Sequence, residues 1–281
     1  MKAFLFAGQG AQKVGMASDT VHIEKVRSLF SLAEKKFPGL VELMTAGDPE
    51  LLNRTVNTQP AMFLADLAYA YKAEEEGGRP DAVCGFSVGE IPALVYAGAL
   101  SEEDGLEIIG LRARLMDEAS TRNGGKMIAV IGLDVQTVEN IAAQVEDCWA
   151  VNFNAPSQTV VAVGLSGADK LCGLVKEKGG RALPLRVSGA FHCPYMSSAA
   201  DGLKVLLEKT RFSAPKIPVY ANLTGKPYEG DEDARKELLW RQVMSPVRFT
   251  DTVANMKADK IDEFVEVGPG NVLTGLIAKN K

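Results

Sequence analysis

Short apolar runs that read as strands alternate with longer helix-like segments from the first residues of the chain onward. Lys2–Ala7 is a strand-like run that leads into a glycine turn, and Gln59–Glu76 has the composition of a helix. Ala82–Phe86 is a second strand-like run, and Glu102–Ala119 follows it as a long helix. Strands that alternate with helices are typical of α/β domains, so the sequence predicts an α/β fold.

The segment between Met127 and Val187 has its own order of predicted strands and helices. Its strand-like and helix-like stretches follow the order β-α-β-β-α-β within about 60 residues, which is the ferredoxin-like pattern. We therefore predict a small subdomain at residues 126–188, inserted into a large α/β domain that is formed by residues 1–125 and 189–281. Glycines stand at both junctions. A cleft between two such parts is a natural place for a functional site.

Composition limits the partners and the compartment that suit this chain. The net charge of −5 and the isoelectric point of about 5.3 argue against a nucleic-acid surface. No run of roughly 20 apolar residues is present, so no membrane span is expected. The four cysteines are widely spaced, and the first residues read better as a strand than as a signal peptide. We therefore expect reduced thiols, no bound metal and a cytoplasmic location.

The stretch Gly85-Phe86-Ser87-Val88-Gly89 places a serine between two glycines, where a buried strand turns into a helix. This is the context of a nucleophile elbow, in which a tight turn lifts the serine oxygen to the mouth of a cleft. The positive end of the following helix favours negative charge at that point. The same residues also suit an ordinary turn with a capping serine, so the motif alone leaves both interpretations open.

A serine becomes a strong nucleophile when a base removes its proton, and the chain has two histidines. His22 opens an exposed-looking helix and is interpreted as structural. His192 follows a turn of small residues where the large domain resumes, and it is the candidate base. Cys193 is interpreted as a packing residue because immediate neighbours in sequence rarely point at each other. No acidic residue stands out as a third member, so a dyad of Ser87 and His192 is predicted, oriented by a backbone carbonyl.

The helix at 102–119 carries an arginine on its apolar side. On a period of 3.6 residues, Arg112 lies one turn after Ile108 and one turn before Met116, whereas Arg114 falls on the polar side. A buried arginine without an anion costs about 3–5 kcal/mol, so Arg112 requires a partner. That partner is either an internal carboxylate or a substrate carboxylate held by the guanidinium fork. An enzyme that handles a dicarboxylic half-ester has a use for such a cation.

Further motifs occur along the whole chain in a definite order. They are Gly8-Gln9-Gly10-Ala11-Gln12, Asn57-Thr58-Gln59-Pro60-Ala61, Gly85-Phe86-Ser87-Val88-Gly89-Glu90, Arg112 with Leu115-Met116, Val151-Asn152-Phe153-Asn154, Gly189-Ala190-Phe191-His192, Arg241-Gln242 before Ser245-Pro246-Val247, and Glu266-Val267-Gly268-Pro269-Gly270. With these motifs the chain resembles the malonyl-CoA:acyl-carrier-protein transacylases of fatty acid synthesis. The resemblance implies an α/β-hydrolase-like large domain with a ferredoxin-like insert, in agreement with the segmentation above.

The resemblance also implies a reaction and a role for each matching residue. Ser87 would carry the malonyl group as an ester, His192 would act as base and then as acid, and Arg112 would bind the free carboxylate of malonate. The supporting residues would be Gln9 and Val88 as backbone donors of an oxyanion hole, Gln242 as the carbonyl behind the histidine, Asn154 near the site, and Phe191 against α-methyl groups. The malonyl group would pass from malonyl-CoA to the phosphopantetheine thiol of acyl carrier protein in two ping-pong steps, without a cofactor. We expect a monomer.

The chain departs from the family pattern at Phe86, where the family has histidine, and at Ala7, where it has proline. Strand alternation predicts that Phe86 faces away from Ser87, so we expect the chemistry to survive. Docking of an acidic carrier protein on this net-acidic chain requires local basic residues. The candidates, which equally suit an ordinary solvated face, are Lys176, Lys178, Arg181 and Arg186.

Three other functions fit parts of the pattern. A serine esterase or thioesterase would need an acidic third residue and has no use for Arg112. A free-standing malonyltransferase of a polyketide synthase shares every motif and differs in its carrier protein. A scaffold that docks carrier proteins without turnover would explain Phe86 as decay, but it leaves Ser87, His192 and Arg112 without a purpose.

Overall fold

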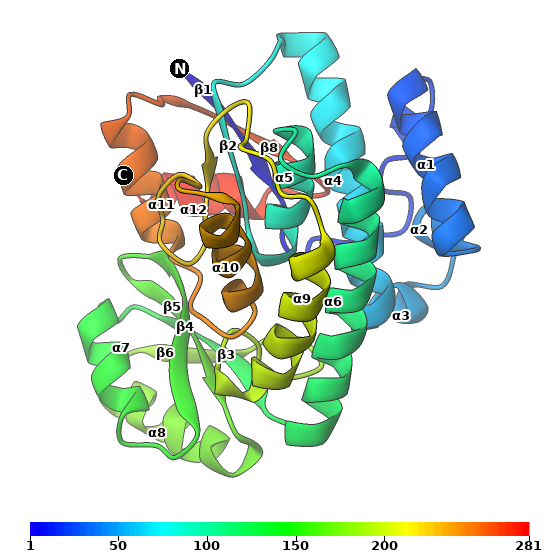
Figure 1. The fold of residues 1–281 in the computed structure, drawn as a ribbon. Coiled ribbons are helices and arrows are strands. Elements are labelled where there is room, and N and C mark those ends of the chain that lie inside the picture. The colour runs from blue at the N-terminus through cyan, green and yellow to red at the C-terminus, as the bar shows by residue number, and fades with distance from the viewer. Residues whose placement is uncertain (281) are drawn as a thin grey trace.

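A four-stranded parallel sheet organises the large domain in the computed structural model, which describes residues 1–280 (Figure 1). The strand order is β7-β2-β1-β8, and every neighbouring pair is parallel. The strands are β1 (Lys2–Phe6), β2 (Ala82–Gly85), β7 (Val219–Tyr220) and β8 (Glu263–Val267). At the carboxyl end of β1, Phe6 pairs with Gly85 on one side and with Val267 on the other. The serine motif therefore begins at the carboxyl edge of the sheet, where ligands bind in open α/β sheets.

Helices cover both faces of this sheet, as expected for parallel strands whose faces are both buried. The helices of the large domain are α1 (Glu24–Lys36), α2 (Leu40–Ala46), α3 (Pro49–Leu52), α4 (Thr55–Gly77), α5 (Glu90–Tyr96), α6 (Glu102–Asn123), α9 (Ser197–Lys209), α10 (Glu232–Gln242), α11 (Phe249–Ala258) and α12 (Val272–Lys279). The two longest, α4 and α6, pack against each other. Helix α6 begins where the Ser101 Oγ accepts a hydrogen bond from the N–H of Asp104, and it ends at Gly124, whose φ is 67°. These signals fix the length of the helix that carries Arg112.

The insert is a second, antiparallel sheet with two helices on one side, and it occupies the lower part of Figure 1. Its elements follow the order β3 (Lys126–Ile131), α7 (Val135–Ala142), β4 (Cys148–Ala155), β5 (Gln158–Val163), α8 (Ala168–Glu177) and β6 (Arg181–Pro184). The strand order in space is β4-β5-β3-β6. The predicted α/β fold with a ferredoxin-like insert is confirmed. The residue boundaries of the three parts, placed at 125/126 and 188/189, stay a prediction.

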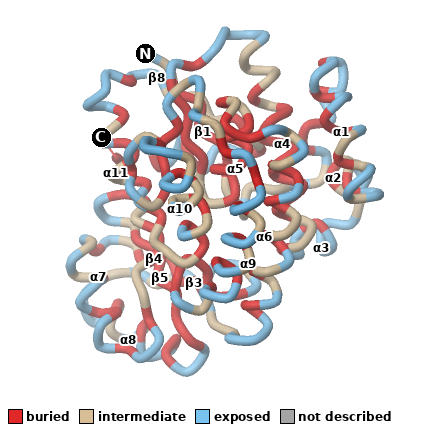
Figure 2. The backbone as a smooth tube through the Cα atoms, in the orientation of Figure 1, coloured by how far each residue is buried: buried red, intermediate tan, exposed pale blue. Residues whose placement is uncertain are grey.

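The apolar side chains form three clusters, and buried stretches occur in both parts of the molecule (Figure 2). The largest cluster, the large core, extends from the large domain to the insert through residues such as Met127 and Val160. The strands of the parallel sheet lie inside the large core, where Phe4 and Phe6 are at most 1% exposed. The core of the insert is smaller and is made by side chains such as Val130, Val161 and Leu171 from its strands and helices. The parts meet at an edge-to-face contact between Trp149 of β4 and Tyr195, with ring centroids 5.1 Å apart.

Two elements begin or end at other residues than the sequence pattern indicates. His22, expected to open a helix, lies in a turn, and α1 begins at Glu24, because the N–H of Ile23 bonds to the Thr20 carbonyl after a short 3₁₀ helix. Strand β6 ends at Pro184, before the predicted end of the segment at Val187, although the Leu185 N–H still donates to the Met127 carbonyl at 2.8 Å.

Candidate active site

Ser87 stands in a sharp turn between β2 and α5. The turn is a short 3₁₀ segment, Ser87–Gly89, and Ser87 itself has a φ of 54°, in the left-handed region. A Cβ on Gly85 would lie 1.9 Å from the Gly89 carbonyl oxygen, and a Cβ on Gly89 would lie 2.4 Å from the Phe6 carbonyl oxygen. Both flanking glycines are therefore required, because β1, β2 and the turn pass too close to each other for a side chain.

The imidazole of His192 contacts the serine hydroxyl. Its Nε2 lies 2.7 Å from Ser87 Oγ, and its Nδ1 lies 2.9 Å from the Gln242 carbonyl oxygen. Because a carbonyl oxygen only accepts, Nδ1 carries the proton and Nε2 is free to accept the serine proton. Burial, followed by the positive charge of Arg112, lowers the pKa of His192 to about 4. The histidine is therefore a neutral base at physiological pH.

The guanidinium of Arg112 is the third group at this point. The residue is 2% exposed, and its Nη2 donates to Ser87 Oγ at 3.1 Å. Amide oxygens hold two other donors: Gln59 Oε1 lies 2.7 Å from Nη1, and Gln242 Oε1 lies 2.9 Å from Nη2. Within residues 1–280 no carboxylate forms a direct ion pair with Arg112. Burial lowers the pKa of Arg112 to about 10, so the side chain remains a cation at neutral pH.

A buried polar network supports these three side chains, and of its members only Gln242 was among the predicted site residues. Glu90 accepts hydrogen bonds from Tyr228, Gln242 and Asn222. Asn222 in turn accepts from the Ser87 N–H at 2.6 Å and donates to the Gly85 carbonyl at 2.6 Å. The position of Glu90 in the sequence carries no signal of burial, because an acidic residue in the first turn of a helix is ordinary. Asn222 carries none either.

The groups enclose a small cavity of about 70 Å³. Its lining is Gln9, Gln59, Phe86, Ser87, Arg112, Met116, Met127, Asn152, Leu185, Val187, Phe191 and His192. The structure thus brings Gln9 and Phe191 to the cavity together with Ser87, His192 and Arg112. A water molecule occupies about 30 Å³ of liquid, so this space suits a short acyl group and excludes a long acyl chain in the conformation described.

Asn154 is not among the residues that line this cavity, and its place near the site stays a prediction. Its Oδ1 is buried without a hydrogen-bond partner within the described residues, and its carbonyl accepts from Asn280. Asn152, two residues earlier on β4, lines the cavity instead. Strand β4 has register irregularities between residues 150 and 155, so the pattern of the motif did not determine which asparagine faces the serine.

The structure does not support the prediction that Phe86 faces away from Ser87, because both residues line the same cavity. The ring packs edge-on against Phe249, with centroids 5.6 Å apart. Strand β2 ends at Gly85, so strand alternation does not extend across the turn to residues 86 and 87.

The backbone N–H groups of Gln9 and Val88 are available for a ligand. The Ser87 N–H is taken by Asn222, but neither the Gln9 nor the Val88 N–H donates a hydrogen bond within residues 1–280. Val88 belongs to the turn that opens α5, and the Gln9 side chain lines the cavity. Two unpaired donors beside a serine oxygen are what an oxyanion hole requires.

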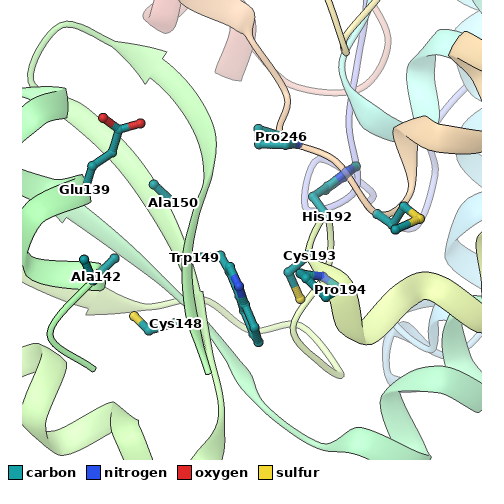
Figure 3. A pocket seen from close by; sticks show the side chains of 11 residues that line it. Glu139, Ala142, Cys148, Trp149, Ala150, His192, Cys193, Pro194 and Pro246 are labelled. Atoms are coloured by element: carbon teal, nitrogen blue, oxygen red, sulfur yellow. The ribbon is translucent and has the colours of Figure 1, made fainter. Parts of the chain in front are cut away.

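A second hollow, of about 330 Å³, lies on another side of His192 (Figure 3). Trp149 projects from the insert toward Cys193 and Pro194 of the large domain and forms part of its wall. Cys193 is 1% exposed, and burial raises the pKa of its thiol to about 12. A buried thiol of this kind is a packing group and a poor nucleophile.

Two other features are absent from the part of the chain that the structure describes. No cluster of three His, Cys, Asp or Glu side chains among these residues is placed to hold a metal ion. None of the helices described is long and apolar enough to cross a membrane. The basic residues predicted for docking are exposed on the insert, namely Lys176, Lys178, Arg181 and Arg186.

Comparison with known proteins finds relatives across the whole chain. Residues 3–280 match the family described as acyl transferase domain. A malonyl CoA-acyl carrier protein transacylase from Bacillus subtilis is 35% identical over 99% of this chain and 89% of its own length. The crystal structure of an acyl-carrier-protein S-malonyltransferase from Burkholderia pseudomallei has a TM-score of 0.94 at 38% identity, covering 100% of this chain and 93% of that one. A malonyl-transacylase in complex with a type II PKS acyl-carrier protein has a TM-score of 0.94 at 36% identity, covering 99% and 92%.

Proposed function

The chain belongs to the acyl transferase family, among the malonyl-CoA:acyl-carrier-protein transacylases, and from this premise we propose a two-step transfer through Ser87. The malonyl group moves from coenzyme A to the serine, and then to the phosphopantetheine thiol of acyl carrier protein. The observation that carries the proposal is the convergence on one oxygen: Ser87 Oγ lies 2.7 Å from His192 Nε2 and 3.1 Å from Arg112 Nη2.

In the first step His192 Nε2 removes the hydroxyl proton while Ser87 Oγ attacks the thioester carbonyl carbon. The carbonyl oxygen becomes an oxyanion, which the N–H groups of Gln9 and Val88 stabilise, each by about 3–4 kcal/mol of barrier. The C–S bond then breaks, and the coenzyme A sulfur leaves with the proton from His192. The Gln242 carbonyl keeps the imidazole in the required tautomer throughout.

In the second step the carrier-protein thiol replaces coenzyme A. His192 takes the thiol proton, the sulfur attacks the malonyl ester, and the same two N–H groups receive the oxyanion. The C–O bond to Ser87 breaks, and the serine oxygen recovers its proton from His192. The protein's own groups supply every proton transfer, so the reaction as proposed needs no cofactor.

Arg112 gives the transfer its preference for malonyl groups. Gln59 and Gln242 hold two of its N–H groups, and the bond to Ser87 Oγ is released when the hydroxyl becomes an ester. The remaining N–H groups can then hold the malonyl carboxylate through charge-assisted bonds. Phe191 lines the same cavity and disfavours a substituent on the α-carbon, an effect that typically amounts to about 1–3 kcal/mol.

The decisive experiment is mass spectrometry of the protein after incubation with malonyl-, methylmalonyl- or acetyl-CoA. We expect a malonyl adduct on Ser87, much less adduct with the other two thioesters, and loss of the adduct when acyl carrier protein is added. Release of free malonate at the rate of transfer would favour a hydrolase. Absence of any adduct would leave the non-catalytic scaffold.

A role in fatty acid synthesis fits the relatives, and one structural relative is the transacylase of a type II PKS carrier protein. The two pathways use the same chemistry and differ in the carrier protein. Transfer rates measured with fatty-acid and polyketide carrier proteins in parallel would separate them, and we expect the fatty-acid carrier to be the better acceptor.

A further inference from the structure

Glu90 is a fully buried acidic residue to which the mechanism above gives no role. It is 0% exposed and stands at the first position of α5, three residues after Ser87. It forms no ion pair within the described residues. A buried carboxylate is costly unless something compensates its charge.

The hydrogen bonds around Glu90 suit a carboxylate. The Tyr228 hydroxyl donates to Oε1 at 2.5 Å, and the Gln242 side chain and the Asn222 N–H donate to Oε2 at 2.8 Å and 3.2 Å. An ionised carboxylate only accepts, and of these three partners only the Tyr228 hydroxyl could accept a proton in return. Three donors converging on one carboxyl group favour its charged form.

A single amide group connects this carboxylate to Arg112. Gln242 donates through Nε2 to Glu90 at 2.8 Å and accepts through Oε1 from Arg112 at 2.9 Å. The two opposite charges are therefore separated by one side chain. The carboxylate also favours the orientation in which the oxygen of the Gln242 amide, and not its NH₂ group, faces the guanidinium.

We propose that Glu90 is the counter-anion of Arg112 in the acyl-free enzyme and that it tempers the preference for malonyl groups. The intervening amide lets the charges compensate each other while the carboxylate stays out of the guanidinium fork. A malonyl carboxylate then enters a site that already holds one anion, and like charges in a buried site repel each other. The inference rests on the proposed role of Arg112 in binding the acyl carboxylate.

The variant Glu90→Gln removes the charge and can keep the hydrogen bonds. An amide oxygen at the place of Oε2 accepts from Gln242 and Asn222, and an NH₂ group at the place of Oε1 donates to the Tyr228 hydroxyl. The matched control, Tyr228→Phe, removes one of these bonds and keeps the charge. Burial raises the pKa of Glu90 to about 7, and loss of the Tyr228 donor raises it further, so the assays are run at pH 9, where the carboxylate is ionised and Arg112 is still a cation.

We expect the ratio of kcat/KM for malonyl-CoA over acetyl-CoA to rise on the order of tenfold in Glu90→Gln, mainly through a lower KM for malonyl-CoA. The ratio should stay at the wild-type value in Tyr228→Phe. In an Arg112→Ala background Glu90→Gln should no longer change the ratio. An unchanged or lower ratio in the single variant would overturn the inference. A malonyl adduct on Ser87 in that variant would show that the proposed function still stands.

Thermal unfolding provides a test that does not depend on activity. Glu90→Gln leaves Arg112 as an uncompensated buried cation, so the free protein should melt several degrees lower. Adding Arg112→Met to the same chain removes both charges and should recover most of that loss. If Glu90→Gln lowered the melting temperature equally in chains with Arg112 and in chains with Met at position 112, the proposed charge pairing would be contradicted.

Discussion

Ser87 and His192 both have backbone conformations that non-glycine residues rarely adopt, with φ values of 54° and 60°. Such a conformation costs on the order of 1–3 kcal/mol and persists where the surroundings hold it. Asn222 bonds to the Ser87 N–H, and the His192 N–H bonds to the Val243 carbonyl at 3.1 Å. The two groups are thus set in position before a substrate arrives, and the strain is balanced by bonds to distant parts of the chain.

Replacing the single residue Arg112 with alanine tests its proposed role in binding the malonyl carboxylate. Loss of a charge-assisted partner inside a buried site typically costs about 2–5 kcal/mol, so kcat/KM for malonyl-CoA should fall by about 30- to 5,000-fold. The value for acetyl-CoA should change far less, because acetyl has no carboxylate. Arg114→Ala on the same helix is the control, since Arg114 is exposed and pairs only with Glu118. Malonyl selectivity that survives in Arg112→Ala would refute the role.

The lowered pKa of His192 predicts an acid-tolerant acylation step. Because burial and Arg112 lower that pKa from 6.5 to about 4, the imidazole stays neutral and able to accept a proton until the pH approaches 4. The rate of Ser87 acylation, measured by rapid quench at saturating malonyl-CoA, should be flat above pH 5 and fall by half at about pH 4. His22→Gln should give the same profile. A titration near pH 6.5 would contradict the neutral, buried base.

At the scale of elements, the site depends on how closely the strands and helices approach the nucleophile turn. The turn lies between β1 and β2 on one side and the loop that carries Asn222 on the other. Helices α4 and α6 pack together, so that Gln59 of α4 accepts a hydrogen bond from Arg112 of α6 while Arg112 donates to Ser87 Oγ. The capped start of α6 at Ser101 sets which turn of that helix reaches Ser87.

Alanine substitutions at two glycines, one in the nucleophile turn and one in a helix of the insert, test this close approach. Gly89→Ala places a Cβ 2.4 Å from the Phe6 carbonyl oxygen, so the strand and the turn must separate. We expect a loss of several kcal/mol in the free energy of unfolding, as for other overpacked backbone contacts, and loss of Ser87 acylation. Gly173→Ala in α8 meets no atom within 4 Å and should stabilise the protein by about 0.5–1 kcal/mol. Chemical denaturation and adduct formation measure both. An active, stable Gly89→Ala variant would contradict the elbow geometry.

At the scale of the whole molecule, the candidate active site lies where the large domain and the insert meet. The cavity takes residues from the carboxyl edge of the parallel sheet and from strands β3 and β4 of the insert. The contact between Trp149 and Tyr195 joins the parts beside His192. An acyl group on Ser87 is therefore anchored to the large domain, and residues of the insert cover it in the small cavity.

Charge reversal on the insert tests where the carrier protein docks. Lys176→Glu with Arg181→Glu should raise KM for acyl carrier protein severalfold at low salt, because a basic patch steers an acidic partner. The KM for malonyl-CoA and transfer to free pantetheine should stay unchanged. Lys35→Glu with Lys36→Glu on α1 of the large domain is the control pair. An unaltered carrier-protein KM would assign these residues to an ordinary solvated face.

The sequence alone determined the class of fold, a tight glycine-flanked turn at Ser87 and the inward position of Arg112. These features are local: strand and helix periodicity, paired glycines and a charge on an apolar helix face act within a few turns of chain. The ferredoxin-like order of the insert was readable for the same reason. Resemblance to a family added the partners that lie far away in sequence, such as His192 with Gln242.

Only the tertiary structure decided which groups meet across the site. Asn152, and not Asn154, lines the cavity, because β4 has register irregularities that interrupt the alternation of side chains. Phe86 lines the same cavity as Ser87, because β2 ends at Gly85 and the alternation of side chains does not continue into the turn. The link from Glu90 through Gln242 to Arg112 joins three elements more than 100 residues apart at its extremes. Hydrogen bonds between such distant residues arise from packing, and no local pattern of residues encodes them.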